Sequence, residues 1–346
     1  MSDINIRKIG RAGRITFTRP KALNALSYKM ALAVEDALDN WAIDPEVEVV
    51  VIDAEGEKAF CAGGDIAELY DTGTKGDFAY GQKFWADEYR MNAKVSYFPK
   101  PIVSFMQGFT MGGGVGVGCH ASNRIVGDSS QIAMPEVGIG LVPDVGGSYI
   151  LANAPGHLGE YLGLTASRMG AADAILAGFA DSYIPESEWP ALIAQLETTA
   201  DPSLIASTAQ TPPTGTLAAN LDQINAIFDE TRLANILTTL RNDTSDFAAK
   251  TLKSLSRNSP LAMGCALDLI RRNRDAKDIR TALQNEYRYT YRATEHSDFL
   301  EGIRAAIIDK DRNPQWRHRL DDPLAQHVAK MMLPLGDAEL SFQKGD

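Results

Sequence analysis

Two glycine runs, Gly63-Gly64 and Gly112–Gly114, constrain the fold of this chain more than any other feature. Each run follows a short apolar stretch that is typical of a buried strand, and each stands where a helix is expected to begin. Backbone N–H groups at the start of a helix have no intrahelical partner and carry partial positive charge. Glycine runs can also serve turn geometry alone. Taken together, the two runs predict turns whose bare amides converge on one ligand oxygen.

Strands and helices alternate through the first half of the sequence. We expect two short strands over residues 4–19, a helix from Ser27 to Trp41, strands over 47–54 and 101–108, and a helix over 77–97. Alternation of this kind predicts an α/β core whose strands are at least partly parallel.

The second half of the sequence is typical of helices. Residues 200–216 are rich in Ser, Thr, Pro, Gly and Gln, which indicates a linker or a long surface loop. Beyond it, apolar residues at helical spacing predict helices over 217–228, 231–241, 244–256, 260–274, 278–292 and 296–307. We therefore predict two parts, a core over residues 1–205 and a helical region over residues 206–346.

Composition and charge exclude several classes of protein. The net charge of −11 argues against a general nucleic-acid surface, but not against a local basic pocket for one phosphorylated molecule. The three cysteines are far apart and match no zinc spacing or disulfide framework. Gly and Pro break the apolar stretches before they could span a membrane, and the N-terminus lacks an apolar signal stretch. We expect a cytoplasmic protein without a metal centre.

Two acids, Glu136 and Asp144, lie in a segment of small and apolar residues. Burial there would strip water from a carboxylate and raise its pKa, which makes it a stronger base. Carboxylates beside bare amides suit acyl chemistry, because one group attacks or deprotonates while the other holds an oxyanion. Each acid also has a plain structural interpretation, Glu136 as a salt-bridge partner and Asp144 as a turn or helix-capping residue.

Other catalytic arrangements find little support in the sequence. No Gly-x-Ser-x-Gly elbow occurs, which argues against a serine-hydrolase triad. His120 and the other four histidines are not expected to take part in chemistry. The glycines at 112, 114 and 116 do not match the spacing of a dinucleotide-binding fingerprint.

Four segments, read together, resemble the crotonase superfamily of enoyl-CoA hydratases and isomerases. They are Arg19-Pro-Lys-Ala-Leu-Asn-Ala-Leu, Lys58-Ala-Phe-Cys-Ala-Gly-Gly-Asp-Ile, Gln107-Gly-Phe-Thr-Met-Gly-Gly-Gly and Met134-Pro-Glu-Val-Gly-Ile-Gly. The resemblance implies an α/β fold, a crotonase-like spiral of ββα repeats with a C-terminal helical region. It also implies an oxyanion hole formed by the N–H groups of Gly64 and Gly113.

Within the superfamily, local features resemble the 3-hydroxyisobutyryl-CoA hydrolases. Hydratases carry a second catalytic glutamate two residues after the triple glycine, where this chain has Gly116. Hydratases usually have glycine after the proline of the later segment, where this chain has Asp144, as those hydrolases do. The run from Ser297 to Trp316 is also similar to the hydrolases. The resemblance thus implies that Glu136 and Asp144 are the catalytic residues.

The resemblance further implies how an acyl-CoA substrate binds. CoA would lie across the loops 20–25 and 61–66, and the residues implied in binding are Lys21, Leu23, Ala62, Asp65 and Ile66. Lys21 is the candidate for a phosphate contact. CoA is part of the substrate, so no separate cofactor is expected. Trimers are common in the superfamily, which leaves a homo-oligomer open for this chain.

The implied reaction is hydrolysis of a short-chain 3-hydroxyacyl-CoA thioester, with 3-hydroxyisobutyryl-CoA of valine degradation as the first candidate. Two alternatives stay open. An enoyl-CoA hydratase or isomerase would use Glu136 alone. A non-catalytic acyl-CoA-binding protein would keep the fold without turnover.

Overall fold

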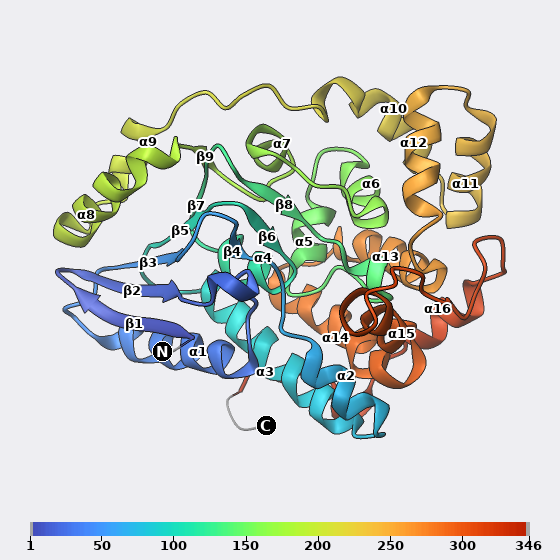
Figure 1. Ribbon diagram of the computed structural model, residues 1–346, viewed down its shortest axis with the longest axis horizontal. Coiled ribbons are helices and arrows are strands. Elements are labelled where there is room, and N and C mark those ends of the chain that lie inside the picture. The colour runs from blue at the N-terminus through green and yellow to red at the C-terminus, as the bar shows by residue number, and fades with distance from the viewer. Residues whose placement is uncertain (1–2, 344–346) are drawn as a thin grey trace.

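The computed structural model describes residues 3–343, and the ends of the two predicted parts, residues 1–2 and 344–346, lie outside the described chain. In Figure 1 the strands gather on the left of the molecule and the C-terminal helices on the right. Among the described residues, no helix is both long and apolar enough to cross a membrane.

The chain begins with a hairpin followed by a capped helix. β1 (Ile4–Ile9) and β2 (Ala12–Phe17) pair antiparallel, which confirms the two strands predicted over residues 4–19. The side chain of Ser27 accepts a hydrogen bond from Met30 N at 3.3 Å and so caps α1 (Tyr28–Ile43). The buried face of α1 packs on the core.

The next six strands form three consecutive pairs. In each pair the first strand belongs to a large sheet and the second to a small sheet. The pairs are β3 (Val49–Ala54) then β4 (Ala59–Cys61), β5 (Ile102–Met106) then β6 (Phe109–Met111), and β7 (Asn123–Val126) then β8 (Gln131–Ala133). The large sheet has the order β1-β2-β3-β5-β7-β9, with β9 at Ser182–Tyr183, and the small sheet has the order β4-β6-β8. From β2 onward, neighbouring strands are parallel. The predicted ββα spiral with parallel strands is confirmed.

Helices complete each turn of the spiral. α2 (Ala67–Thr74) and α3 (Phe78–Ser96) follow β4, α4 (Gly113–Gly118) follows β6, and the short 3-10 helix η2 (Glu136–Ile139) follows β8. Next come α5 (Gly147–Ala152), α6 (Leu158–Thr165) and α7 (Ala171–Leu176). The two glycine runs thus end strands of the small sheet and precede helices, as the sequence predicted.

Two helices that follow α7 were not predicted. α8 (Trp189–Thr199) packs Trp189, Leu192 and Leu196 on the large sheet in an apolar cluster with residues of β3, β5 and β7. α9 (Ser203–Thr208) lies inside the predicted linker, so that prediction is wrong over these 6 residues. Beyond α9, an irregular segment crosses the top of the molecule in Figure 1 to the C-terminal helices.

The C-terminal region is helical, as predicted. Its helices are α10 (Leu221–Phe228), α11 (Leu233–Asn242), α12 (Asp246–Leu255), α13 (Pro260–Asn273), α14 (Ile279–His296), α15 (Phe299–Ile303), the π-helical η5 (Arg304–Ile308) and α16 (Ala325–Met331). The helix predicted over 296–307 is found as α15 and η5, which follow each other directly over 299–308; its start differs, because α14 runs on to His296.

One apolar core joins the spiral to the C-terminal helices. Phe17 of β2, Leu162 of α6, Ile270 of α13 and Tyr289 of α14 belong to the same buried cluster. α14 packs directly against α3, and α13 packs against α5 and α6. The C-terminal helices therefore help to build the interior. The boundary near residue 205 stays a prediction.

The contact between α15 and η2 depends on Gly302. A Cβ at this position would lie 2.1 Å from the carbonyl oxygen of Ile139, far inside van der Waals contact. We predict that Gly302→Ala lowers the free energy of unfolding by at least ~2 kcal/mol, as measured by urea denaturation. Gly170→Ala is the matched control, because a Cβ there would meet nothing within 4 Å. Equal stability of the two variants would contradict the prediction.

Candidate active site

The two glycine turns meet because β4 and β6 are parallel neighbours in the small sheet. A Cβ placed on Gly112 would lie 3.5 Å from the Cα of Gly63, and one on Gly113 would lie 3.3 Å from the nitrogen of Gly64. Within residues 3–343, the amides of Gly64 and Gly113 donate to no protein group. The predicted oxyanion-hole residues are therefore close together, and both N–H groups are available to an acceptor.

The loops predicted to bind CoA also lie side by side. Leu26 N donates to Gly63 O at 2.9 Å, and Ala62 N donates to Leu23 O at 3.0 Å. Leu23 and Asn24 adopt φ values of 51° and 53°, in the left-handed region that most side chains avoid. Asn24 stabilises this turn, because its buried amide donates to the carbonyls of Glu55 and Ala59 at 2.9 and 2.8 Å.

The five predicted CoA contacts lie on these two loops. Lys21 is exposed, whereas Leu23, Ala62, Asp65 and Ile66 are half-buried. The carboxylate of Asp65 accepts a hydrogen bond from the Arg19 guanidinium at 2.9 Å, so this acid ties the two loops together. The binding role of all five residues stays a prediction.

Glu136, the first residue of η2, faces the glycine turns. The residue is buried, and a Cβ on Gly112 would lie 3.0 Å from its Oε1. Among the described residues, its Oε2 has no hydrogen-bond partner. Burial, followed by the negative charge of Asp144, raises the pKa of Glu136 well above its ordinary value. A buried carboxyl with an unused oxygen is the form expected of a reacting group.

Asp144 is buried beside Glu136 and is held by a tyrosine. The hydroxyl of Tyr89 donates to Asp144 Oδ2 at 2.8 Å and lies 3.3 Å from Thr290 Oγ1 of α14. Burial raises the pKa of Asp144 to about 7, although the hydrogen bond from Tyr89 opposes this rise. Two such neighbours resist double ionisation, so Glu136 and Asp144 together keep a proton near neutral pH.

Glu88 of α3 is a third buried acid, which the sequence analysis missed. A Cβ on Gly113 would lie 3.1 Å from its Oε1, and in the described chain this oxygen has no hydrogen-bond partner. Burial and the charge of Asp144 raise the pKa of Glu88 to about 8. The available signal was its position four residues after Phe84 and three after Trp85, on their apolar face. Across residues 3–343, no group of His, Cys, Asp and Glu could hold a metal ion.

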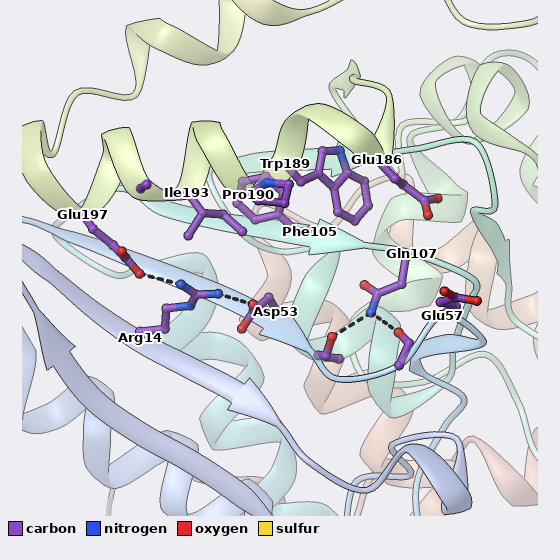
Figure 2. A pocket seen from close by; sticks show the side chains of 13 residues that line it. Arg14, Asp53, Glu57, Phe105, Gln107, Glu186, Trp189, Pro190, Ile193 and Glu197 are labelled. Atoms are coloured by element: carbon purple, nitrogen blue, oxygen red, sulfur yellow. Dashed lines mark hydrogen bonds and ion pairs between the residues drawn. The ribbon is translucent and has the colours of Figure 1, made fainter.

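A separate cavity of about 380 Å³ lies between α8 and the large sheet. Figure 2 shows Arg14 between Asp53 and Glu197, and Gln107 bonded to two backbone carbonyls. None of the residues predicted for the active site lines this cavity. The buried acids and the amides of Gly64 and Gly113 lie elsewhere, at the glycine turns.

Comparison with known proteins identifies the family. The sequence profile described as enoyl-CoA hydratase/isomerase matches residues 12–332. The chain belongs to this family. The predicted resemblance to the crotonase superfamily is thereby confirmed.

Three relatives illustrate the range of named activities. The mitochondrial 3-hydroxyisobutyryl-CoA hydrolase of Xenopus tropicalis is 37% identical over 97% of this chain and 90% of its own length. A crystal structure of an enoyl-CoA hydratase from Rhodobacter sphaeroides is 56% identical, with a TM-score of 0.93 over 98% of this chain and 100% of that one. A carnitinyl-CoA dehydratase from Mycobacterium thermoresistibile is 36% identical, with a TM-score of 0.94 and full coverage of both chains. The protein is thus a crotonase-family acyl-CoA enzyme resembling 3-hydroxyisobutyryl-CoA hydrolase.

Glycine at position 116 distinguishes this chain from the hydratase pattern, because a larger side chain would not fit there. A Cβ on Gly116 would lie 2.5 Å from Asn92 Nδ2 and 2.8 Å from Val145 Cβ. A glutamate at this position would therefore collide with two buried neighbours. Their side chains fill the space in which a second hydratase acid would stand.

The raised pKa of Glu88 predicts a pH-dependent stability effect. An unfolded glutamate ionises near its ordinary pKa of 4.5, but the folded Glu88 keeps its proton up to about 8, so stability falls as pH rises through this window. We predict that Glu88→Gln raises the free energy of unfolding at pH 8 by roughly 1–3 kcal/mol and changes it less at pH 5. Urea denaturation at both pH values measures the difference.

The control is Glu57→Gln at an exposed position, for which we expect a change within about 0.5 kcal/mol at either pH. An effect of Glu88→Gln that is the same at pH 5 and pH 8 would contradict the assigned ionisation.

Proposed function

We propose that this crotonase hydrolyses a short-chain 3-hydroxyacyl-CoA thioester, with 3-hydroxyisobutyryl-CoA as the first candidate, to the free acid and CoA. The observation that carries the proposal is the buried carboxyl of Glu136 beside the amides of Gly64 and Gly113: within residues 3–343, neither its Oε2 nor the two amides have a hydrogen-bond partner. The 37% identity with the Xenopus tropicalis hydrolase supports the choice of substrate.

The first step is activation of the thioester. Its carbonyl oxygen accepts hydrogen bonds from Gly64 N–H and Gly113 N–H. Negative charge grows on this oxygen as the carbonyl carbon is attacked, so fixed donors stabilise the transition state more than the ground state. Hydrogen bonds from Leu26 N to Gly63 O and from Asp65 N to Leu26 O hold the first glycine turn against the loop before it.

Glu136 then attacks the carbonyl carbon. A bond forms between its carboxylate oxygen and that carbon, the C–S bond breaks, and the thiolate of CoA leaves with a proton from the acid pair. Water cleaves the resulting mixed anhydride and returns Glu136 as a carboxylate. In the alternative route, Glu136 takes a proton from the water that attacks the thioester directly. The family resemblance favours the anhydride.

Asp144 and Glu88 shape the acyl side of the site. Asp144 accepts a hydrogen bond from the 3-hydroxyl of the substrate and shares its proton with Glu136. A site built around such a hydrogen bond rejects substrates that lack the hydroxyl. Glu88 has a pKa of about 8 and is therefore mostly uncharged at neutral pH. In this form it adds little repulsion to the negative charge that grows on the thioester oxygen at the amides.

We predict that Glu136→Gln slows CoA release from 3-hydroxyisobutyryl-CoA at least ~100-fold, because the amide neither attacks nor deprotonates. A thiol reagent that detects free CoA measures the rate. Calorimetry with CoA is the control, and we expect binding to stay within about 3-fold because the loops that hold CoA are unchanged. Full activity of the variant would overturn the role of Glu136.

We predict that Asp144→Asn lowers the preference for 3-hydroxyisobutyryl-CoA over isobutyryl-CoA at least ~10-fold, because the uncharged amide has only one accepting oxygen, which the Tyr89 hydroxyl also needs. The negative charge of Asp144 raises the pKa of Glu136, so its removal lowers that pKa. The acidic limb of the kcat/KM profile should therefore move to lower pH. Profiles of wild type and variant between pH 5.5 and 9 on both esters measure the two effects, and an unchanged preference argues against the role of Asp144.

The second candidate function is enoyl-CoA hydration or isomerisation. Its support is the 56% identity with the protein from Rhodobacter sphaeroides that is titled an enoyl-CoA hydratase. The crowded position 116 argues against hydration with two acids. Loss of the enoyl absorbance of crotonyl-CoA, without thiol release from 3-hydroxyisobutyryl-CoA, would favour this candidate. Binding of both esters without turnover would favour a non-catalytic protein.

We also propose a cytoplasmic location and a homo-oligomer. The three cysteines, Cys61, Cys119 and Cys265, are buried free thiols, which suits a reducing compartment. Ile307 and Ile308, each 45% exposed in η5, support an interface with another copy.

A further inference from the structure

The loop that carries Asp144 is held by a glutamate from the C-terminal region. Glu286 of α14 is fully buried, and its carboxylate accepts hydrogen bonds from Gly146 N at 2.8 Å and Ser148 N at 3.2 Å. The hydroxyl of Ser148 donates to the same carboxylate. One side chain thus pairs three donors in the residues that follow Asp144.

The backbone of this loop needs such support. Val145 has φ +52°, a conformation that costs a β-branched residue on the order of 1–3 kcal/mol. His120 Nε2–H donates to Val145 O at 2.8 Å, and Gly147 N donates to Asp144 O at 2.6 Å. Without Glu286, the amides of Gly146 and Ser148 would be buried without partners, at a cost of roughly 1–3 kcal/mol each.

α14 also acts on Asp144 through the side chain of Tyr89. Thr290, one helical turn after Glu286, contacts the Tyr89 hydroxyl that donates to the Asp144 carboxylate. Behind the loop, Asn273 Nδ2 of α13 donates to Ser148 Oγ at 2.7 Å. The C-terminal helices therefore hold both the backbone and the side chain of Asp144.

Both oxygens of the Glu286 carboxylate are used in this arrangement. Gly146 N bonds Oε2, while Ser148 N and the Ser148 hydroxyl bond Oε1. A glutamine would offer one accepting oxygen and an NH₂ group that itself donates, so at least one of these donors would lose its acceptor. Burial and the charge of Asp144 raise the pKa of Glu286, while the hydrogen bonds from Ser148 and Gly146 lower it. The three donors therefore favour a carboxylate at this place, next to the loop of Asp144.

We propose that Glu286 is a positioning residue for Asp144: by fixing residues 145–148 it aims the Asp144 carboxyl at the 3-hydroxyl of the substrate. The C-terminal region thereby sets the selectivity of a site whose reacting groups all come from the spiral. This inference rests on the proposed function.

The test compares kcat/KM for 3-hydroxyisobutyryl-CoA with kcat/KM for isobutyryl-CoA in wild type, Glu286→Gln and Ser148→Ala. The ratio of the two values is independent of the fraction of folded protein, so a general loss of stability leaves it unchanged. We expect the ratio to fall at least ~5-fold in Glu286→Gln and to a smaller extent in Ser148→Ala, which keeps both backbone bonds.

The matched control is Glu160→Gln. Glu160 is also fully buried, but within residues 3–343 the hydrogen bonds of its carboxylate come from His157, Arg271 and Arg274, none of which belongs to residues 144–148. We expect the selectivity ratio of this variant to equal that of wild type.

A selectivity ratio that stays at the wild-type value in both Glu286→Gln and Ser148→Ala would overturn the inference while leaving the proposed function intact. If Glu286→Gln does not fold, Ser148→Ala alone decides. Wild-type protein that releases CoA from neither ester would refute the proposed function, and the inference with it. A ratio lowered equally in Glu160→Gln would assign the effect to general packing and also count against Glu286.

Discussion

The candidate site depends on a close contact between two backbone segments, which leaves no room for a side chain between them. A Cβ on Gly114 would lie 2.2 Å from the carbonyl oxygen of Cys61, so the helix that follows β6 contacts the end of β4 directly. Only glycine permits this contact, and the contact aligns the amides of Gly64 and Gly113. The parallel pairing of β4 with β6 sets the spacing of the two turns, while the larger sheet supports them from the core.

The buried acids around these amides are costly to stability. Glu88, Glu136, Asp144 and Glu286 are all buried, and the charge of Asp144 raises the pKa of the other three. Such a cluster persists only in a well-packed framework that can tolerate the cost. Here the framework includes α13 and α14, whose side chains bond the loop after Asp144.

The sequence predicted local elements better than their arrangement. The helix predicted from Ser27 to Trp41 matches α1 within two residues, because capping and apolar spacing are local signals. The spiral itself was inferred from resemblance, since strand order depends on pairing between distant segments. α8 went unpredicted although Leu192 and Leu196 are spaced for a helix face. For the site, Glu136 and Asp144 stood out in an apolar loop, whereas Glu88 and Glu286 lie in helices, where burial of an acid depends on tertiary packing.

The crowded surroundings of Gly116 also limit which substitutions this position can accept. Asn92 and Val145 come from different segments and would lie 2.5 and 2.8 Å from a Cβ at 116, so a larger residue there requires both to move or to be replaced. The intermediates would carry a void and a loosened loop before any new activity appeared. A single substitution at 116 would therefore cost stability before it could supply a second acid, which disfavours a one-step change to the two-acid hydratase pattern.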